Sequence, residues 1–295
     1  MYNLVTVLGW EERFMLGLKH ILNNFTLEKI TLIRFEDYLS MSNMNHNYES
    51  IIELSKKYNF DIVEINLQYN DSIKSWNILE DYFSEVNNNY LFNITTIPRE
   101  TIWTLFFFLK RKLQSLNYIY FRPKKYCNEW LTKNHKFPRL LFKHSGLFDL
   151  NKKLALFVIA GFDNARLEQL IDFYEPSKIV IFYQNGNYFK NIDRDEKFYS
   201  FIKRFDHEIV KINTYDVQET TNKIFDQFLT YKNEYNIIID SQGPKISAMS
   251  VYDVYLKSEE KIGLAYVAAK DFNSKYSEGI DLEFIFGEFK FPVYE

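Results

Sequence analysis

Short apolar runs alternate along the chain with longer stretches whose apolar residues recur at helical spacing. The runs at 4–8, 29–35, 60–66, 91–94 and 116–121 have the length and the β-branched and aromatic content of buried strands. The stretches between them repeat apolar positions every three or four residues, as an amphipathic helix does. Alternating strands and helices predict an α/β fold with a mainly parallel, doubly wound sheet.

Eight stretches have the helical spacing. They are 12–25, 48–60, 75–86, 100–113, 165–176, 196–207, 218–235 and 247–260. The last segment, DLEFIFGEFKFPVYE (281–295), alternates in the way a strand does and contains one glycine. It predicts an antiparallel β-hairpin at a sheet edge, turning at Gly287.

The same pattern occurs twice. LVTVLGWEER (4–13) resembles LFVIAGFDNAR (156–166), and five further pairs of segments follow in the same order, ending with RLLFKHSGLF (139–148) and LEFIFGEFKF (282–291). A repeat of about 150 residues has the size of a normal domain. The chain therefore predicts two tandem Rossmann-like units, 1–150 and 151–295, each with a terminal β-hairpin or edge strand.

Composition limits the function classes. A net charge of −3 argues against bulk nucleic-acid binding. The single cysteine, Cys127, excludes an intramolecular disulfide and a cysteine-cluster metal site, which suits a reducing cytoplasm. The N-terminus lacks the basic region of a signal peptide, and the most apolar run, 101–113, is too short to span a bilayer. We therefore expect a cytoplasmic protein without a membrane partner.

Ligands of open α/β sheets bind beyond the carboxyl ends of the strands, where the strand order reverses. In a flavodoxin-like order the first and fourth strands of each unit border that crevice. The loops after these strands each bring a cation to the start of a helix, where free N–H groups already favour an anion. The predicted ligand-binding residues are Gly9, Trp10, Glu11, Arg13, Thr95, Thr96, Arg99, Gly161, Phe162, Asp163, Arg166, Asp240, Ser241, Gln242, Gly243 and Lys245.

Individual roles follow from the chemistry of these residues. Glu11 and Asp163 are placed to accept hydrogen bonds from ribose hydroxyls, and Trp10 and Phe162 to stack on a base. A purely structural interpretation stays open beside this one. Glycine after a strand also serves a tight turn, and Asp240 is of a type that caps helices.

Other chemistry finds little support. The chain has no G-x-G-x-x-G or Walker A pattern, so no dinucleotide or P-loop cofactor is expected. Its five histidines lack metal-ligand spacing, and no metal is expected. Asp281 with Glu288 and Lys290 has the residue types of a metal-dependent nuclease, but the spacing is short and an alternating hairpin explains the charges better.

The stretch DSQGPKISAM (240–249) resembles the motif that follows the fourth strand in CARF domains, the CRISPR-associated Rossmann-fold sensors. The resemblance implies a Rossmann-like core and binding of a cyclic oligoadenylate in the cleft of a two-fold dimer, with cleavage of that ligand in some members. By motif position, the ligand-facing residues would be Asp240, Gln242, Gly243 and Lys245, with Gly161, Phe162 and Asp163. The resemblance covers the second unit well and the first loosely, because 95–99 lacks the glycine.

The loops predict an anionic nucleotide-type ligand. The resemblance to CARF domains implies a sensor of such a ligand, for example a cyclic oligoadenylate, in prokaryotic antiviral defence, with a protein partner in the same system. Lys245 and Arg99 are the candidates for stabilising charge if a ribose 2′-hydroxyl attacks its own phosphate. Two alternatives stay open. One is a nucleotide- or sugar-processing enzyme unrelated to CARF domains, and the other is a non-catalytic subunit of a defence complex.

Overall fold

A computed structural model of the chain describes residues 1–41, 43–68, 70–85, 89–127, 130–161, 164–184, 192–281 and 283–292, with the backbone alone at 192–195. The chain divides into two compact units. The first unit consists of Met1–Cys127 together with Ser274–Glu295, and the second consists of Asn128–Asn273.

The first unit is built on a six-stranded sheet with the order β16-β5-β4-β1-β2-β3. Its strands are β1 (Tyr2–Val7), β2 (Leu27–Phe35), β3 (Asp61–Leu67), β4 (Tyr90–Asn93), β5 (Ser115–Phe121) and β16 (Phe284–Lys290). Its helices are α1 (Glu12–Asn24), the short 3₁₀ helix η1 (Glu36–Tyr38), α2 (Met44–Tyr58), α3 (Ser72–Tyr82) and α4 (Arg99–Leu109). All neighbouring strands are parallel except β16, which runs antiparallel to β5.

The second unit repeats this topology, with the order β11-β10-β9-β12-β13-β8. Its strands are β8 (Arg139–Leu140), β9 (Lys153–Ile159), β10 (Lys178–Gln184), β11 (His207–Ile212), β12 (Tyr235–Ser241) and β13 (Gly263–Tyr266). Its helices are α5 (Asn164–Tyr174), α6 (Ile192–Ile202), α7 (Val217–Tyr231) and α8 (Ser247–Lys257). Here too the outermost strand, β8, is antiparallel to its neighbour β13.

Two short antiparallel ladders complete the structure. In the first unit β6 (Lys125–Tyr126) pairs with β15 (Ser277–Glu278). In the second unit β7 (Thr132–His135) pairs with β14 (Ala269–Phe272).

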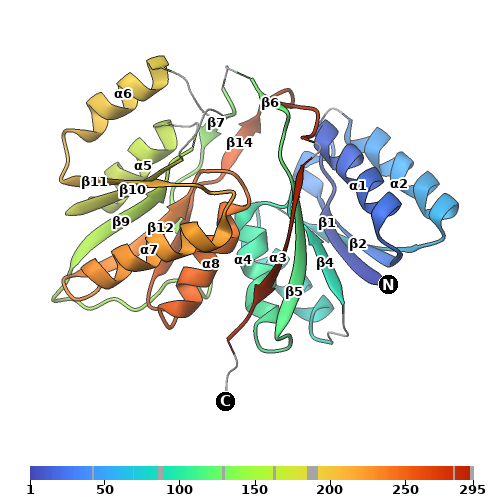
Figure 1. Cartoon of the computed structure of the whole chain (residues 1–295), viewed down its shortest axis with the longest axis horizontal. Coiled ribbons are helices and arrows are strands. Elements are labelled where there is room, and N and C mark those ends of the chain that lie inside the picture. Colours follow the sequence, from blue (N-terminus) through green and yellow to red (C-terminus); the bar gives the residue numbers. More distant parts are fainter. Residues whose placement is uncertain are drawn as a thin grey trace. The chain divides into compact units, whose positions relative to one another are not determined.

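Helices cover both faces of each sheet (Figure 1). In the first sheet His20 of α1 contacts Phe121 of β5, with ring centroids 5.5 Å apart. On the opposite face Phe106 of α4 packs against Phe92 of β4, with centroids 6.1 Å apart. The predicted α/β fold with two doubly wound, mainly parallel sheets is confirmed. Each of the eight predicted helices is present, with ends within about five residues of the predicted ones.

The predicted flavodoxin-like strand order is wrong. The third strand of each unit joins the sheet beyond the second, and the chain then returns to place the fourth strand on the free side of the first. The first and fourth strands are therefore direct neighbours, β1 beside β4 and β9 beside β12. This arrangement puts the reversal of strand order, and hence the expected ligand crevice, between them.

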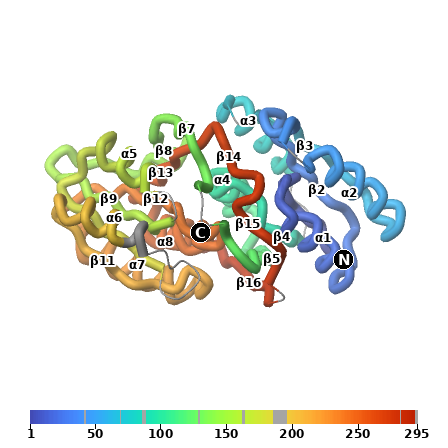
Figure 2. The backbone as a smooth tube through the Cα atoms, turned by 90° about the horizontal axis from the view of Figure 1, so that it is seen from above, coloured from blue at the N-terminus to red at the C-terminus, as the bar shows by residue number. Residues whose placement is uncertain are grey.

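The predicted hairpin at Gly287 is also wrong, because 284–290 forms one uninterrupted strand beside β5 (Figures 1 and 2). The edge strands are moreover exchanged between the two halves of the sequence. β8, from the first half, closes the second sheet, and β16, from the second half, closes the first. The compact units therefore differ from the expected division at residue 150.

Gly287 lies opposite Tyr118, and a Cβ added to it would lie 2.5 Å from Cζ and Oη of that ring. We expect Gly287→Ala to lower the free energy of unfolding by about 1–3 kcal/mol, because the buried ring must move away. Chemical denaturation measures this loss, with Lys290→Ala on the same strand as the control. In a Tyr118→Ala background the glycine substitution should cost much less. Equal costs in both backgrounds would contradict the account.

Candidate functional site

The loops after the first and fourth strands touch each other in both units. In the first unit a Cβ on Gly9 would lie 2.7 Å from Cγ2 of Thr96. In the second unit a Cβ on Gly161 would lie 2.0 Å from the carbonyl oxygen of Gln242. Both glycines are needed because only a residue without a side chain allows this approach. The structure thus brings the two predicted loops of each unit together at the carboxyl end of its sheet.

In the first unit the threonines of the second loop hold the backbone. Thr96 Oγ1 donates to the carbonyl of Val7 at 2.8 Å, and Thr95 Oγ1 accepts from the backbone N–H of Phe121 at 3.0 Å. Both side chains are buried. Trp10, which was predicted to stack on a base, packs edge-on against Tyr38 with centroids 5.7 Å apart. Arg99 is half-buried at the start of α4.

Glu11 and Arg13 form a buried ion pair with each other. Nε of Arg13 donates to Oε2 of Glu11 at 2.8 Å, its Nη2 also bonds the same carboxylate, and its Nη1 donates to the carbonyl of Phe121 at 3.3 Å. Tyr276 and Ser277, from the chain segment that returns to the first unit, complete the network. The Tyr276 hydroxyl donates to Glu11, and Ser277 Oγ donates to Oε2 of Glu11 at 3.0 Å.

This network changes the interpretation of Glu11 and Arg13. Burial is the largest single influence and lowers the pKa of Arg13, but the Glu11 carboxylate and three tyrosines, Tyr276, Tyr120 and Tyr126, together raise this pKa well above its ordinary value. Arg13 is only 2% exposed and Glu11 only 4%. The two groups satisfy each other and fasten the returning segment to the start of α1, so the geometry favours a structural role over recognition of an anion or a ribose.

In the second unit the loop 240–246 leads directly into α8. Gly243 packs against β9, where a Cβ would lie 2.9 Å from Cγ2 of Ile159. Ser241 and Ser247 share a hydrogen bond of 2.6 Å between their hydroxyls. The helical turn begins at Pro244, since its carbonyl accepts from the N–H of Ser247 at 2.9 Å. Lys245 therefore lies half-buried in the turn directly before α8.

Gln242 differs from its buried neighbours. Its backbone N–H donates to the carbonyl of Ile159 at 2.9 Å, which fixes the loop against the end of β9. Its side-chain nitrogen, Nε2, is shielded from solvent and has no acceptor among the described residues. An amide donor in this state lowers stability unless a ligand or a water accepts from it.

Asp240 lies under α5. Side chains alternate along a strand, so Asp240 shares the face of Ile238, which packs in one core cluster with Leu167 and Leu170 of α5. Asp240 is 2% exposed. Burial and the Asp240 charge raise the pKa of Tyr174 to about 12, against the influence of Arg139. The carboxylate thus belongs to a buried polar cluster, and Arg166 of α5 is also buried. Phe162 and Asp163 lie outside the described residues.

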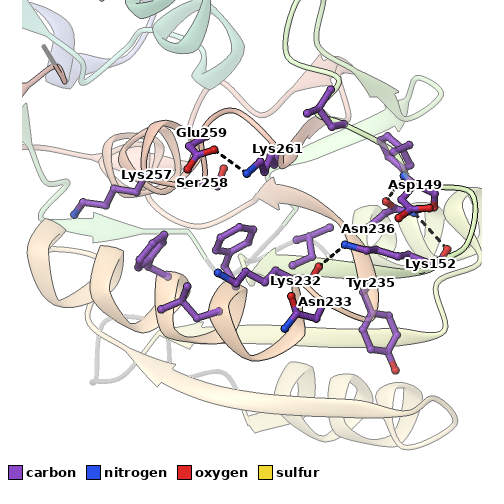
Figure 3. Close-up of a pocket in the computed structure, with 16 residues that line it drawn as sticks. Asp149, Lys152, Lys232, Asn233, Tyr235, Asn236, Lys257, Ser258, Glu259 and Lys261 are labelled. Carbon is purple, nitrogen blue, oxygen red and sulfur yellow. Dashed lines mark hydrogen bonds and ion pairs between the residues drawn. The ribbon is translucent and has the colours of Figure 1, made fainter. Parts of the chain in front are cut away.

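A pocket that the sequence did not predict lies in the second unit at the amino end of its sheet (Figure 3). It has a volume of about 580 Å³ and lies between the carboxyl-terminal ends of α7 and α8 and the segment before β9. No motif marks it, because its lining comes from three separate segments, 147–152, 225–237 and 257–261.

Among the described residues, no helix is both long and apolar enough to cross a membrane. Over the same residues, no three side chains of His, Cys, Asp or Glu gather in a way that could hold a metal ion.

The Glu11–Arg13 pair gives a direct test. Glu11→Ala leaves a buried guanidinium without its carboxylate and should lower the free energy of unfolding by about 3–5 kcal/mol in chemical denaturation. The exposed Glu53→Ala, on α2, should change it by less than about 0.5 kcal/mol. Adding Arg13→Met to Glu11→Ala should recover much of the loss. If the double variant were less stable than Glu11→Ala, the network would not be the cause.

Tyr276 makes stability depend on alkaline pH. Burial first, and then the Glu11 charge, raise its pKa well above 10.0. The folded state therefore holds the phenol proton more tightly, and this contribution is complete below pH 10 and is lost above it. The stability advantage of the natural protein over Tyr276→Phe should shrink by about 1.4 kcal/mol per pH unit above pH 10. Denaturation curves at several pH values measure it, and a constant difference would contradict it.

No family model matches the chain, and neither does any curated protein. Among solved structures, the chain is similar to a type III CRISPR defence DNA nuclease activated by cyclic oligoadenylate, with a TM-score of 0.55 and 7% identity over 86% of this chain. The matched region spans 64% of that nuclease's chain. The cytoplasmic domain of a prokaryotic cation chloride cotransporter matches 91% of this chain and 96% of its own at 10% identity, but its TM-score of 0.29 is too low to indicate a shared fold. The likeness to the nuclease is therefore one of fold.

Proposed function

We propose that the second unit binds an anionic nucleotide-type ligand, such as a cyclic oligoadenylate, at the loops after β9 and β12, and that the chain acts as a sensor of this ligand in antiviral defence. The observation that carries the proposal is the tight contact of Gly161 with Gln242 directly before the first turn of α8. It places an amide donor, a lysine and a helix N-terminus within one short segment, 242–247.

Each of these groups suits a phosphate or a nucleobase. The N-terminal end of α8 carries a partial positive charge, which favours a phosphate. Lys245, two residues before the helix, adds a full charge next to it. The Nε2 donor of Gln242 needs an acceptor, and a base or a ribose oxygen would supply one.

The fold supports the same assignment. The site lies between the first and fourth strands, at the reversal of strand order where open α/β sheets bind ligands. The nuclease of similar fold is activated by cyclic oligoadenylate. The motif DSQGPKISAM, through which the chain resembles CARF domains, forms the end of β12, this loop and the first turn of α8.

Calorimetric titration of the purified chain with cyclic oligoadenylates of different ring size tests the proposal. ATP and a linear oligoadenylate are the comparison ligands, and chromatography of the incubated mixture reports any cleavage. At least one cyclic ligand should bind, and its affinity should fall with rising salt because the contact is partly ionic.

Lys245→Ala and Gln242→Ala should each weaken that binding by about tenfold or more, the loss expected for one charge-assisted contact or one orphaned donor. Lys257→Ala is the matched control, since this lysine lies at the other end of α8 and pairs with Asp253. If no cyclic oligoadenylate binds, or if Lys245→Ala and Lys257→Ala bind alike, the proposed site is wrong.

A further inference from the structure

The pocket at the amino end of the second sheet has a partly apolar lining. Phe225, Phe228 and Leu229 of α7, Ile237 of β12, and Leu147 and Phe148 of the segment before β9 contribute to it. Its volume of about 580 Å³ is within the range of binding pockets, about 300–1,000 Å³. The hollow is therefore large enough to accept several apolar side chains.

The apolar surface extends beyond the hollow. Leu147 is 68% exposed, Phe148 48% and Leu229 43%, and Leu150, just outside the lining, is fully exposed at 101%. Large apolar side chains in such numbers on one short segment and the facing helix mark an interaction surface more often than a solvated one. A small molecule held in the hollow would leave this outer part uncovered, whereas a protein segment would cover it.

Lysines outnumber carboxylates in the pocket lining (Figure 3). Four lysines, Lys152, Lys232, Lys257 and Lys261, line the pocket, against two carboxylates, Asp149 and Glu259. Because Asp253, outside the lining, pairs with Lys257, the local excess is one positive charge (four minus three) on a chain whose net charge is −3.

The four lysines differ in whether they form an ion pair. Lys261 pairs with Glu259 at 2.7 Å, and Lys257 pairs with Asp253 at 2.9 Å. Lys152 Nζ donates to the carbonyl of Lys232 at 2.8 Å, at the end of α7. Neither Lys152 nor Lys232 has a carboxylate within ion-pair distance among the described residues. The lysines partly neutralise two helix ends, but that role needs no exposed apolar side chains beside them.

We propose that this pocket is a docking site for an amphipathic segment of a protein partner, with apolar anchors flanked by acidic residues. The anchors would enter the hollow over Phe228 and Ile237, and the acidic residues would meet Lys152 and Lys232. The same surface of a second copy fits less well, because it would bring lysines against lysines. The proposal does not depend on the ligand loops, which lie at the opposite end of this sheet.

Selection of peptides from a displayed random library on the immobilised full chain tests the proposal. The library is first depleted on Leu229→Glu, a substitution that should leave the melting temperature nearly unchanged because Leu229 is exposed. The enriched peptides should combine leucine, phenylalanine or tryptophan with aspartate or glutamate. A synthetic copy of one, followed by fluorescence anisotropy, should bind at least about tenfold more weakly to Leu229→Glu and to Lys232→Glu.

Phe173→Glu is the matched control, since Phe173 is similarly exposed, at 51%, on α5 of the same unit. It should bind the peptide like the natural chain, and so should Lys245→Ala. The proposal is overturned if no peptide is enriched, if the enriched peptides are basic, or if Leu229→Glu binds them equally well. A dimer in sedimentation that Leu229→Glu abolishes would assign the surface to a second copy. A melting temperature raised by dodecanoate, without peptide enrichment, would assign it to a small amphiphile.

Discussion

The parallel pairing of the first strand with the fourth is the constraint on which the rest of each unit depends. β9 and β12 pair along their whole length, from Lys153 with Tyr235 to Ile159 with Ser241. Because the two strands end at the same level, the loops that follow them must start side by side. Gly161, near the start of the first loop, is the consequence, since the carbonyl of Gln242 occupies the space of a side chain.

The two units use this shared arrangement differently. In the first, the space after β1 is taken by the Glu11–Arg13 pair and by Tyr276, and the polar groups satisfy one another. In the second, the loop after β12 carries the shielded amide of Gln242 and, directly before α8, Lys245. A chain with two similar sheets can thus use one for structural support and leave the other for recognition. The opposite end of the second sheet carries an unrelated, apolar and basic surface.

The sequence predicted well the elements that local patterns determine. It predicted poorly the contacts between segments that lie far apart in the chain. Helices such as 247–257 and the loops after the first and fourth strands follow from periodicity and from glycine and proline positions. The exchange of edge strands could not be predicted, because β5 and β16 are far apart in the sequence and either tail matches an edge strand. The partners of Glu11 were missed for the same reason, as nothing near Tyr276 identifies it as a partner. The face of the second sheet on which the Asp240 side chain lies depends on the register of β12. A register shift of one residue would move this side chain to the opposite face.

The most direct measurement of the central claim is hydrogen–deuterium exchange of the intact chain with and without a cyclic oligoadenylate. Because the proposed ligand site is formed by the loops after β9 and β12, slowed exchange should appear in peptides that cover 159–161 and 241–249. Peptides that cover 225–237, at the other end of the same sheet, should exchange at an unchanged rate. Protection confined to that other end, or no protection anywhere at saturating ligand, would contradict the account.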